Sequence, residues 1–250
     1  MPLTHTPHAH PLLRGLAAGD RNGGPVRLAL LLCRAMSEDG RFEPERVFTA
    51  YRGWFEEGDA YDTGPTLACV VELVRAGVPR AEAARRVYER RPSEGVAPAH
   101  RAAPLALWLR GAALDDALRA EAALSHHAPL SAEVSVAVGR LCAALLDGGS
   151  LREALEGLAD LHLPLILTHE ALRVAPRAAL SPGGHAPEVL RAALWFLTRS
   201  QSLEEALSEA LSFAGPANYC PVLVGSIGGC LYKDVPRRLL EHPQTPPVFF

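Results

Sequence analysis

A polar turn that runs into a glycine-rich helix brings together groups that could do chemistry. The segment FAGPANYCPVLVGSIGGCLY covers residues 213–232, and Tyr219 and Cys220 stand side by side where the helix should begin. A phenol can donate a proton, and a thiol becomes a nucleophile when a basic neighbour or a helix N-terminus lowers its pKa. At the same N-terminus, Asn218 and the free backbone amides could instead hold an anion such as phosphate. The sequence leaves both possibilities open.

Several histidines and one arginine are further candidates for a site. His126 could supply an acid or a base near neutral pH, and the same holds for His100, His127 and His185. For each histidine alone, the alternative is a hydrogen-bonded structural or surface role. Arg101 could pair with a phosphate or carboxylate of a ligand, and its alternative is a salt bridge at the surface.

These candidates must be positioned by helices, because helical periodicity dominates the chain. Apolar residues recur at helical spacing along most segments, and no segment alternates between apolar and polar residues as a strand does. The sequence therefore predicts an all-α fold, formed as a single compact multi-helix domain. The predicted helices cover residues 27–36, 44–57, 64–76, 80–90, 104–110, 114–125, 131–146, 151–158, 187–199 and 203–211, with one more inside 213–232.

The last of these helices has one face that is nearly all glycine. Gly225, Gly228 and Gly229 lie on it, and a glycine inside a helix costs roughly 1 kcal/mol relative to alanine unless close packing offsets that cost. We therefore expect this helix to be buried and another element to approach its backbone closely. Residues 91–99 and 158–187 contain several prolines and glycines and are predicted loops, the second one near a cleft. Two capping boxes are predicted, at Ser150 with Glu153 and at Ser202 with Glu205.

Composition limits the class of protein. At 250 residues with 48% hydrophobic content, the chain has enough apolar material for one large core. We expect one helical domain over residues 12–250, preceded by a flexible tail of residues 1–11 in which histidine and proline are frequent. The net charge of −3, with both signs intermixed, argues against a nucleic-acid partner.

The cysteines indicate the compartment. Five cysteines with no CxxC pair are typical of reduced thiols in a cytoplasmic protein. Cys33, Cys69 and Cys142 lie in apolar helical runs, so we predict that they belong to the core. The sequence has neither a charged-then-apolar leader nor an uninterrupted apolar run of about 18 residues, so we expect neither secretion nor a membrane span.

Ordered segments of the chain resemble the ADP-ribosylglycohydrolase family of all-helical enzymes. The sequence RGLAAGD at 14–20, which ends in Asp20, resembles the first helix of that family. The sequence YDTGPTL at 61–67 resembles a D-x-G-x-T-T stretch, and SEGVAPAHRAAPL at 93–105 resembles a loop that closes over the ligand. The glycine-rich helix completes the set. Because these segments occur in the family's order, the resemblance implies the family's fold.

The resemblance also implies residues that face a ligand. Gly95 and Arg101 are retained in the closing loop, and the dipeptide at 125–126 is similar to a T-H pair before a helix, which brings in His126. His185 falls where the family has a tyrosine before another helix. The residues expected to bind a ligand are Asp20, Gly95, Arg101, Asn218 and His185, and those expected to do chemistry are Asp62, Tyr219, Cys220 and His126.

Asp62 has two interpretations. The resemblance matches it to a carboxylate that family enzymes use at the ribosyl group, where it could act as a general base or stabilise a developing oxocarbenium ion. Alternatively, Asp62 is the N-cap of the helix predicted from Gly64, because aspartate is a strong capping residue and Pro65 is well tolerated in a first helical turn.

The two magnesium ions of the family have no evident ligands here. The family's Asp-Ala-Asp-Thr falls on residues 216–219, where the sequence is Pro-Ala-Asn-Tyr. By the same resemblance, a second ligand-bearing segment is either deleted or replaced by residues 23–26, Gly-Gly-Pro-Val. Magnesium needs oxygen ligands with negative charge among them. We therefore predict no metal and no cofactor.

Two functions remain open. The first is a repurposed, metal-independent enzyme of hydrolase, lyase or cyclase type that acts on a small ribosyl-like or other polar ligand in the ancestral cleft. The second is a catalytically inactive relative that binds ADP-ribose, a nucleotide or a protein partner. Neither requires a nucleic acid or a membrane.

Overall fold

The protein folds into helices around one core. The computed structural model describes residues 10–241 except 22 and 59. These residues form helices and no strand, apart from one isolated antiparallel bridge between Gly95 and His185. The predicted all-α fold is therefore confirmed, whereas most of the predicted N-terminal tail lies outside the described residues. The main helices are α1 (Pro11–Asp20), α2 (Gly24–Asp39), α3 (Pro44–Glu56), α4 (Pro65–Arg75), α5 (Arg80–Arg90), α6 (Ala97–Ala102), α7 (Gly111–Ala122), α8 (Pro129–Leu146), α9 (Leu151–Glu156), α10 (His169–Val174), α11 (Ala186–Leu197), α12 (Leu203–Ala214) and α13 (Tyr219–Tyr232).

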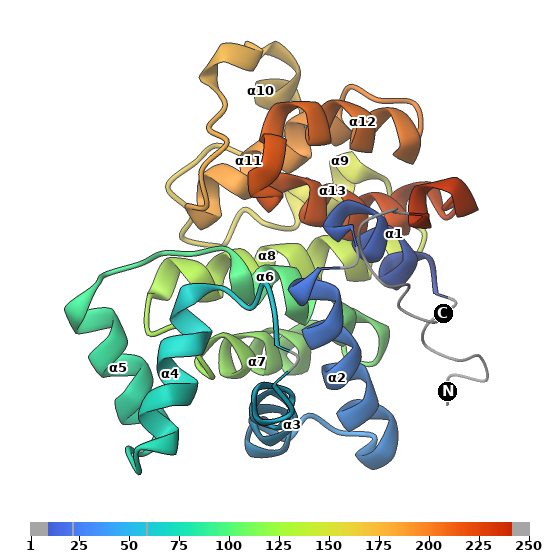
Figure 1. Ribbon diagram of the computed structural model, residues 1–250. Helices are drawn as coiled ribbons and strands as arrows, with labels where there is room; N and C mark the ends of the chain where they lie inside the picture. Colours follow the sequence, from blue (N-terminus) through green and yellow to red (C-terminus); the bar gives the residue numbers. More distant parts are fainter. Residues whose placement is uncertain (1–9, 22, 59, 242–250) are drawn as a thin grey trace.

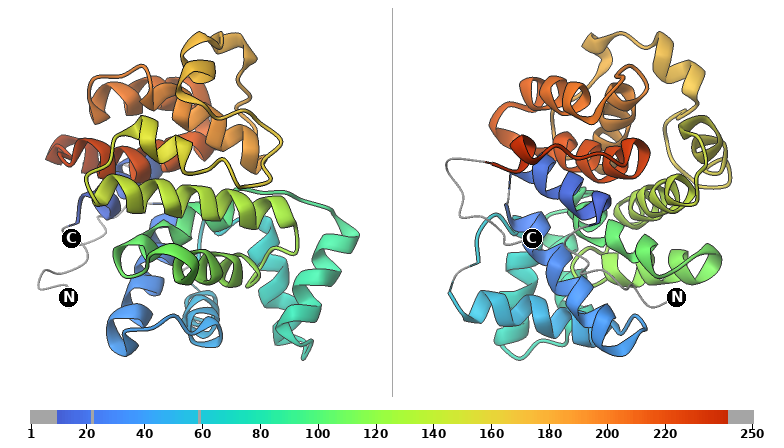
Figure 2. Two further views of the ribbon diagram at one scale, coloured as in Figure 1. Left: turned by 180° about the vertical axis from the view of Figure 1, so that it is seen from behind. Right: turned by 90° about the vertical axis from the view of Figure 1, so that its right-hand side faces the viewer.

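The glycine-rich helix α13 packs on α1 with backbone against backbone. A Cβ added at Gly225 would lie 2.0 Å from the carbonyl oxygen of Gly15, and one added at Gly15 would lie 2.1 Å from that of Gly225. The same close approach recurs between Gly229 and Pro11. The three views of the molecule place these distant segments side by side (Figures 1 and 2). The expected close approach to a buried helix is confirmed, and the first helix of the chain supplies it.

Helix α8 runs through the middle of the molecule. It packs against α6, α7, α11 and α13. By length and composition it is the one helix of the described residues that could cross a membrane, but 61% of its 18-residue apolar window is buried inside the protein. Its apolar character is that of a core helix. The pair α4 and α5 lies on one side of this centre and α10 to α12 lie on the other (Figure 1).

Most helix boundaries agree with the periodicity, with two informative exceptions. The end of the loop predicted at 91–99 belongs instead to α6, because Pro98 stands in the first turn of that helix, where proline does not interrupt helical hydrogen bonds. The helix predicted at 104–110 is instead a short 3₁₀ turn over Ala103–Leu107. The irregular stretch 158–187 contains the short helix α10.

The two predicted capping boxes differ. At Ser150 the box is complete: the Ser150 hydroxyl accepts the Glu153 amide, and the Glu153 carboxylate accepts the Ser150 amide. At Ser202 the hydroxyl accepts the Glu205 amide, but the Glu205 carboxylate accepts the amide of Gln201 instead. Both arrangements satisfy amides that a helix start leaves free.

Candidate functional site

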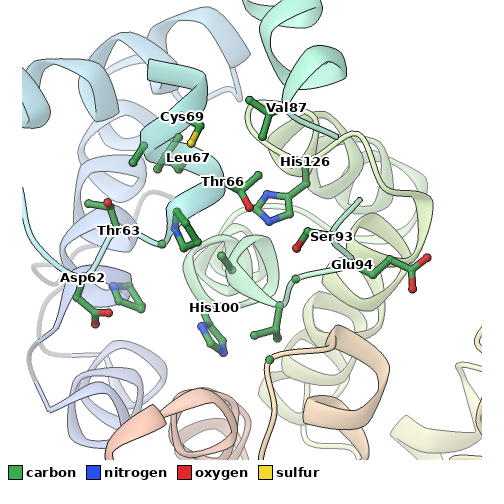
Figure 3. Close-up of a pocket in the computed structure, with 18 of the residues that line it drawn as sticks. Asp62, Thr63, Thr66, Leu67, Cys69, Val87, Ser93, Glu94, His100 and His126 are labelled. Atoms are coloured by element: carbon green, nitrogen blue, oxygen red, sulfur yellow. The ribbon is translucent and has the colours of Figure 1, made fainter. Parts of the chain in front are cut away.

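A pocket of about 870 Å³ opens beside the α4–α5 pair. Its walls come from the start of α2, the pair itself, residues 91–97 and the start of α13. Figure 3 shows Asp62 and Thr63 on one side and His126, Ser93 and Glu94 on the other. Six residues expected from the sequence line this pocket: Asp62, Gly95, His126, His185, Asn218 and Tyr219. Asp20, Arg101 and Cys220 are not among its lining residues.

Asp62 caps a different helix from the one expected. The N-cap of α4 is Gly64 and has no side-chain hydrogen bond, so the capping interpretation for α4 is wrong. The backbone of Asp62 is left-handed, with φ of 48°, and its Oδ2 accepts a long hydrogen bond of 3.4 Å from the amide of Gly24 in the first turn of α2. Helix α2 needs such a partner because its own N-cap, Gly23, has no side chain.

Asp20 meets Asp62 at this helix start. Its Oδ2 accepts the amide of Val26 at 2.8 Å. A Cβ placed on Gly23 would lie 2.6 Å from Asp62 Oδ2 and 2.8 Å from Asp20 Oδ1, so these two oxygens are no further apart than the sum of the two distances. Gly23 therefore lets two carboxyl groups from separate segments converge.

Burial changes the proton affinity of this pair. The side chain of Asp20 is 2% exposed, and burial raises its pKa to about 8, helped by the nearby Asp62. Asp62 is exposed toward the pocket, and partial burial raises its pKa in spite of the hydrogen bond from Gly24. At pH 7 the pair thus keeps at least one proton, and Asp62 is the member that a molecule in the pocket can reach.

Asn218 links this pair to α13. Its backbone is left-handed, with φ of 55°, and its Nδ2 donates to the carbonyl oxygen of Asp20 at 3.0 Å and to Asp20 Oδ1 at 3.2 Å. Tyr219 follows with its side chain 40% exposed, and its ring lies against Gly184, whose added Cβ would be 3.0 Å from the ring carbon Cζ. The start of α13 therefore closes one wall of the pocket.

Two of the cysteines do not lie where the sequence predicts them, since Cys220 is buried outside the pocket and Cys69 lines it. Cys220 is 3% exposed and its Sγ lies 4.0 Å from the carbonyl oxygen of Ala210, away from the pocket. Burial raises the pKa of its thiol to about 12, so the thiolate needed of a nucleophile does not form near neutral pH. Cys33 and Cys142 are buried as predicted. The prediction for Cys69 is wrong, since it is exposed and lines the pocket on the face of α4 that turns away from the core.

Arg101 lies beneath the pocket wall. Its side chain is fully buried, and its Nε donates to Glu121 Oε1 at 2.6 Å in an ion pair that excludes water on both sides. Its Nη2 donates to Ser125 Oγ at 2.8 Å. The surface salt bridge considered as its alternative is therefore wrong, and Arg101 reaches the pocket only through its neighbours.

Two buried histidines face the pocket. Burial lowers the pKa of His126 to about 3, with a further contribution from the Arg101 charge. His100, whose place in the site the sequence could not fix, has its Nε2 2.9 Å from the carbonyl oxygen of Tyr219, and burial lowers its pKa to about 3 as well. Both imidazoles are uncharged at neutral pH. His127 instead packs on the ring of Tyr88, with centroids 5.7 Å apart.

His185 holds two loops together at the pocket rim. Its Nε2 lies 3.0 Å from Glu94 Oε2, with both side chains partly exposed. The backbones run alongside each other here: Val96 donates to the carbonyl oxygen of Gly184 at 3.2 Å, and Ala186 donates to that of Glu94 at 2.8 Å. Residues 93–96 and 184–186 therefore form a short paired strap at the pocket rim.

Sequence reasoning missed several polar residues of the pocket. They lie on α4, just before it, or around the end of α5. They include two adjacent arginines, Arg90 and Arg91, whose side chains have no hydrogen bond or ion pair to the described residues. The run ERRPSEG at 89–95 was the available signal, because two arginines directly before a predicted ligand loop are well placed to meet an anion. The missed lining residues are Thr63, Thr66, Glu72, Arg90, Arg91, Ser93 and Glu94.

The fold and the pocket define an all-helical domain with a pocket lined by residues from several helix ends. The chain belongs to the ADP-ribosylglycohydrolase family, whose model matches residues 25–245. Its fold is similar to that of a solved "ADP-ribosylglycohydrolase-related protein complex", with a TM-score of 0.72 and 24% sequence identity, over 92% of this chain and 89% of that chain. No curated protein matches the chain. The expected family and fold are confirmed.

Proposed function

We propose that the pocket binds a small polar ligand of ribosyl or nucleotide type and that Asp62 acts on it without a metal ion. The observation that carries this proposal is the pair of carboxyl groups at the start of α2, of which Asp62 faces the pocket while Asp20 is buried behind it. A carboxylate whose pKa is raised is suited to take up or release a proton near neutral pH.

The two carboxyl groups, of Asp62 and Asp20, have different roles in this proposal. Asp62 is the group that can touch a ligand, where it can take a proton from water or stabilise positive charge that develops on a ribosyl carbon. Asp20 keeps a proton at pH 7 because it is buried, and Asn218 holds it in place through its side-chain amide. Asp62 is thus the proposed catalytic residue, and Asp20 and Asn218 position it.

The part of the pocket wall around the end of α5 is suited to an anionic group on the ligand. Arg90 and Arg91 line the pocket without ion pairs to the described residues. The two glutamates of the wall already have partners: Glu72 accepts from Arg75 at 2.9 Å, and Glu94 lies against His185. The free charge on this wall is therefore positive, which suits a phosphate or carboxylate.

The residues present do not fit the two magnesium ions of the resembled enzymes. Asp20 and Asp62 both accept amides of α2, whose N-terminus carries the positive end of the helix dipole, and Asp20 is protonated at neutral pH. Both features disfavour a cation there. Among the described residues, no three side chains of His, Cys, Asp or Glu gather as a metal site would require.

Isothermal titration with ADP-ribose, with and without magnesium, tests the binding half of the proposal. We expect binding that does not change when magnesium is replaced by EDTA. Ribose 5-phosphate should bind more tightly than ribose, because only the phosphate can meet Arg90 and Arg91. Binding that requires magnesium would overturn the metal-independent site.

The catalytic half is tested with Asp62→Asn. In EDTA, mass spectrometry of ADP-ribosylated peptides and free ADP-ribose should detect product from the unmodified protein and none from the variant. Asp116→Asn, at an exposed position of α7 outside the pocket, is the matched control and should retain activity. If Asp62→Asn turned over substrate as fast as the unmodified protein, Asp62 would not be the catalytic residue.

A second candidate function is binding without turnover. It is favoured by the hydrogen bond between Asp62 and the start of α2, which gives this carboxylate a purely structural task. Under this alternative, ADP-ribose binds to the protein and to Asp62→Asn alike, and no product forms from any of the substrates.

We propose that the protein works in the cytoplasm, without a nucleic-acid or membrane partner. All five cysteines are free thiols, which supports a reducing compartment. The intermixed charges and the net charge of −3 support a small-molecule ligand over a nucleic acid.

A further inference from the structure

A chain of buried polar groups leads from the core to His126. The Tyr51 hydroxyl donates to Glu121 Oε1 at 2.9 Å, and the same oxygen accepts from Arg101 Nε at 2.6 Å. Arg101 Nη2 is 2.8 Å from Ser125 Oγ, which is in turn 2.8 Å from His126 Nδ1. Tyr51, Arg101, Glu121 and Ser125 are all 0% exposed. The proposed function does not require this series of hydrogen bonds, so the series needs its own explanation.

The chemistry of the groups fixes the direction of the hydrogen bonds. A guanidinium only donates, so Ser125 Oγ is the acceptor toward Arg101. The Ser125 hydroxyl has one hydrogen, and His126 Nδ1 is the only acceptor in contact with it among the described residues. If Nδ1 carried the hydrogen instead, the hydroxyl hydrogen of Ser125 would be left without a partner in a dry environment, which is costly. His126 Nδ1 is therefore the acceptor.

The remaining hydrogen of the neutral imidazole must then be on Nε2. This nitrogen has no hydrogen-bond partner among the described residues, and it lies 3.2 Å from the place where a Cβ of Gly95 would be. His126 lines the pocket, and Figure 3 shows its ring directed between Thr66 and Ser93. The Nε2–H group is thus available to a molecule in the pocket.

We propose that Arg101 is a positioning residue that acts through Ser125 to hold His126 as the Nε2–H tautomer, so that the pocket keeps a permanent, uncharged donor for an acceptor oxygen of the ligand. Only the identity of that ligand rests on the proposed function. Arg101, expected from the sequence to touch a ligand itself, instead transmits its influence over two hydrogen bonds. The positive charge of Arg101 also opposes protonation of His126, which keeps the donor from becoming a cation.

Nitrogen NMR of protein labelled with ¹⁵N-histidine at pH 7 tests the tautomer without any ligand. The His126 signals are assigned by their loss in His126→Gln. We expect Nδ1 in the range of an unprotonated imidazole nitrogen and Nε2 in that of a protonated one. A His126 with its hydrogen on Nδ1, or with both nitrogens protonated, overturns the proposal.

Ser125→Ala should release the tautomer. Without the hydroxyl hydrogen, the Nδ1 and Nε2 shifts of His126 should move toward each other as the two tautomers exchange. Ser135→Ala is the matched control, because Ser135 is equally buried and its Oγ has no hydrogen-bond partner in the described structure. Its His126 spectrum should equal that of the unmodified protein. Ser125→Thr keeps a hydroxyl and should restore the single tautomer, and a spectrum of Ser125→Ala identical to the control would overturn the role of Ser125 and Arg101.

Titration with ADP-ribose separates this inference from the proposed function. If ADP-ribose binds, Nε2 of His126 should shift on binding, and Ser125→Ala should weaken the affinity about twofold, because only the fraction of the protein with the hydrogen on Nε2 can then donate to the ligand. An unchanged Nε2 in the bound protein would overturn the role of His126 as donor. If ADP-ribose does not bind, the proposed function fails, and the ligand-free spectra still decide the tautomer.

Discussion

The contact between α1 and α13 and the wall of the pocket are built by opposite means. In the first, side chains are absent: Gly15 and Gly225 let two backbones touch, and the neighbouring surface is apolar. In the second, charged and polar side chains from separate segments converge, with a buried ion pair between Arg101 and Glu121 behind them. The first region is stabilised by close packing alone, and the second keeps polar groups at a cost in stability. This difference is the reason to place the candidate site in the second region.

The largest expected effect comes from breaking the ion pair behind the pocket. Glu121→Gln leaves the Arg101 charge buried without a counter-ion, and we expect a loss of about 3–5 kcal/mol in the free energy of unfolding. Urea denaturation measures it. Glu133→Gln is the control, because Glu133 pairs with Arg119 near the surface and its removal should cost about 1 kcal/mol or less. Equal losses in the two variants would mean that the buried ion pair contributes no more to the free energy of unfolding than the ion pair near the surface.

The next effect tests the glycine contact. Gly225→Ala puts a methyl group 2.0 Å from the carbonyl oxygen of Gly15, so α1 and α13 must separate, and we expect a loss of about 3 kcal/mol. Gly53→Ala is the same change in α3 at a position with open space around it, where alanine should stabilise the helix by about 0.5–1 kcal/mol. Thermal unfolding compares the two. A tolerated Gly225→Ala would contradict the backbone contact.

The two regions also differ in how far the sequence predicts them. The glycines of α13 could be interpreted alone, because missing side chains along one helix face have one main physical consequence, a close neighbour. Helical periodicity likewise gave most helices, since it depends on residues a few positions apart. Periodicity fails at α6, because Pro98 indicates a loop in the sequence but stands in the first turn of a helix in the structure.

The pocket could be predicted only in part, because its residues come from distant segments. Resemblance to the family supplied Asp62, His126 and Tyr219, which do line it. It could not show that Arg101 turns inward to Glu121, or that Cys220 points to Ala210, since these orientations depend on how α6 and α13 pack. The apolar neighbours of Cys69 predict a core position, and only the three-dimensional structure reveals that its face of α4 borders a cavity.

A smaller effect concerns the proton on Asp20. Its pKa is about 8 in the folded protein and 3.8 when unperturbed, so between pH 5 and 7 the folded state holds a proton that the unfolded state has released. Stability therefore falls as the pH rises, by up to about 1.4 kcal/mol per pH unit from this group. Asp20→Asn cannot release a proton, so its stability relative to the unmodified protein should rise over the same range.

Urea titrations of both proteins at pH 5, 6 and 7 measure that difference. His100 and His126, whose pKa values are lowered, contribute the opposite slope, but they are present in both proteins and cancel in the comparison. Parallel stability curves would mean that Asp20 is ionised in the folded protein, which would contradict its role as the protonated member of the pair.

The smallest effect on stability should come from Gly95→Ala. It makes the same change at the pocket that Gly225→Ala makes at the contact between α1 and α13. The added methyl group would lie 3.2 Å from His126 Nε2 and 3.4 Å from Ser93 Oγ, so these side chains need to give way by only a few tenths of an ångström. We expect the free energy of unfolding to change by less than about 1 kcal/mol, in contrast to Gly225→Ala. ADP-ribose affinity should nevertheless fall several-fold, because the methyl group covers the donor of His126. A change from glycine to alanine would then destabilise the fold at Gly225 and weaken ligand binding at Gly95. An unchanged affinity of Gly95→Ala for ADP-ribose would show that Gly95 is not part of the binding site.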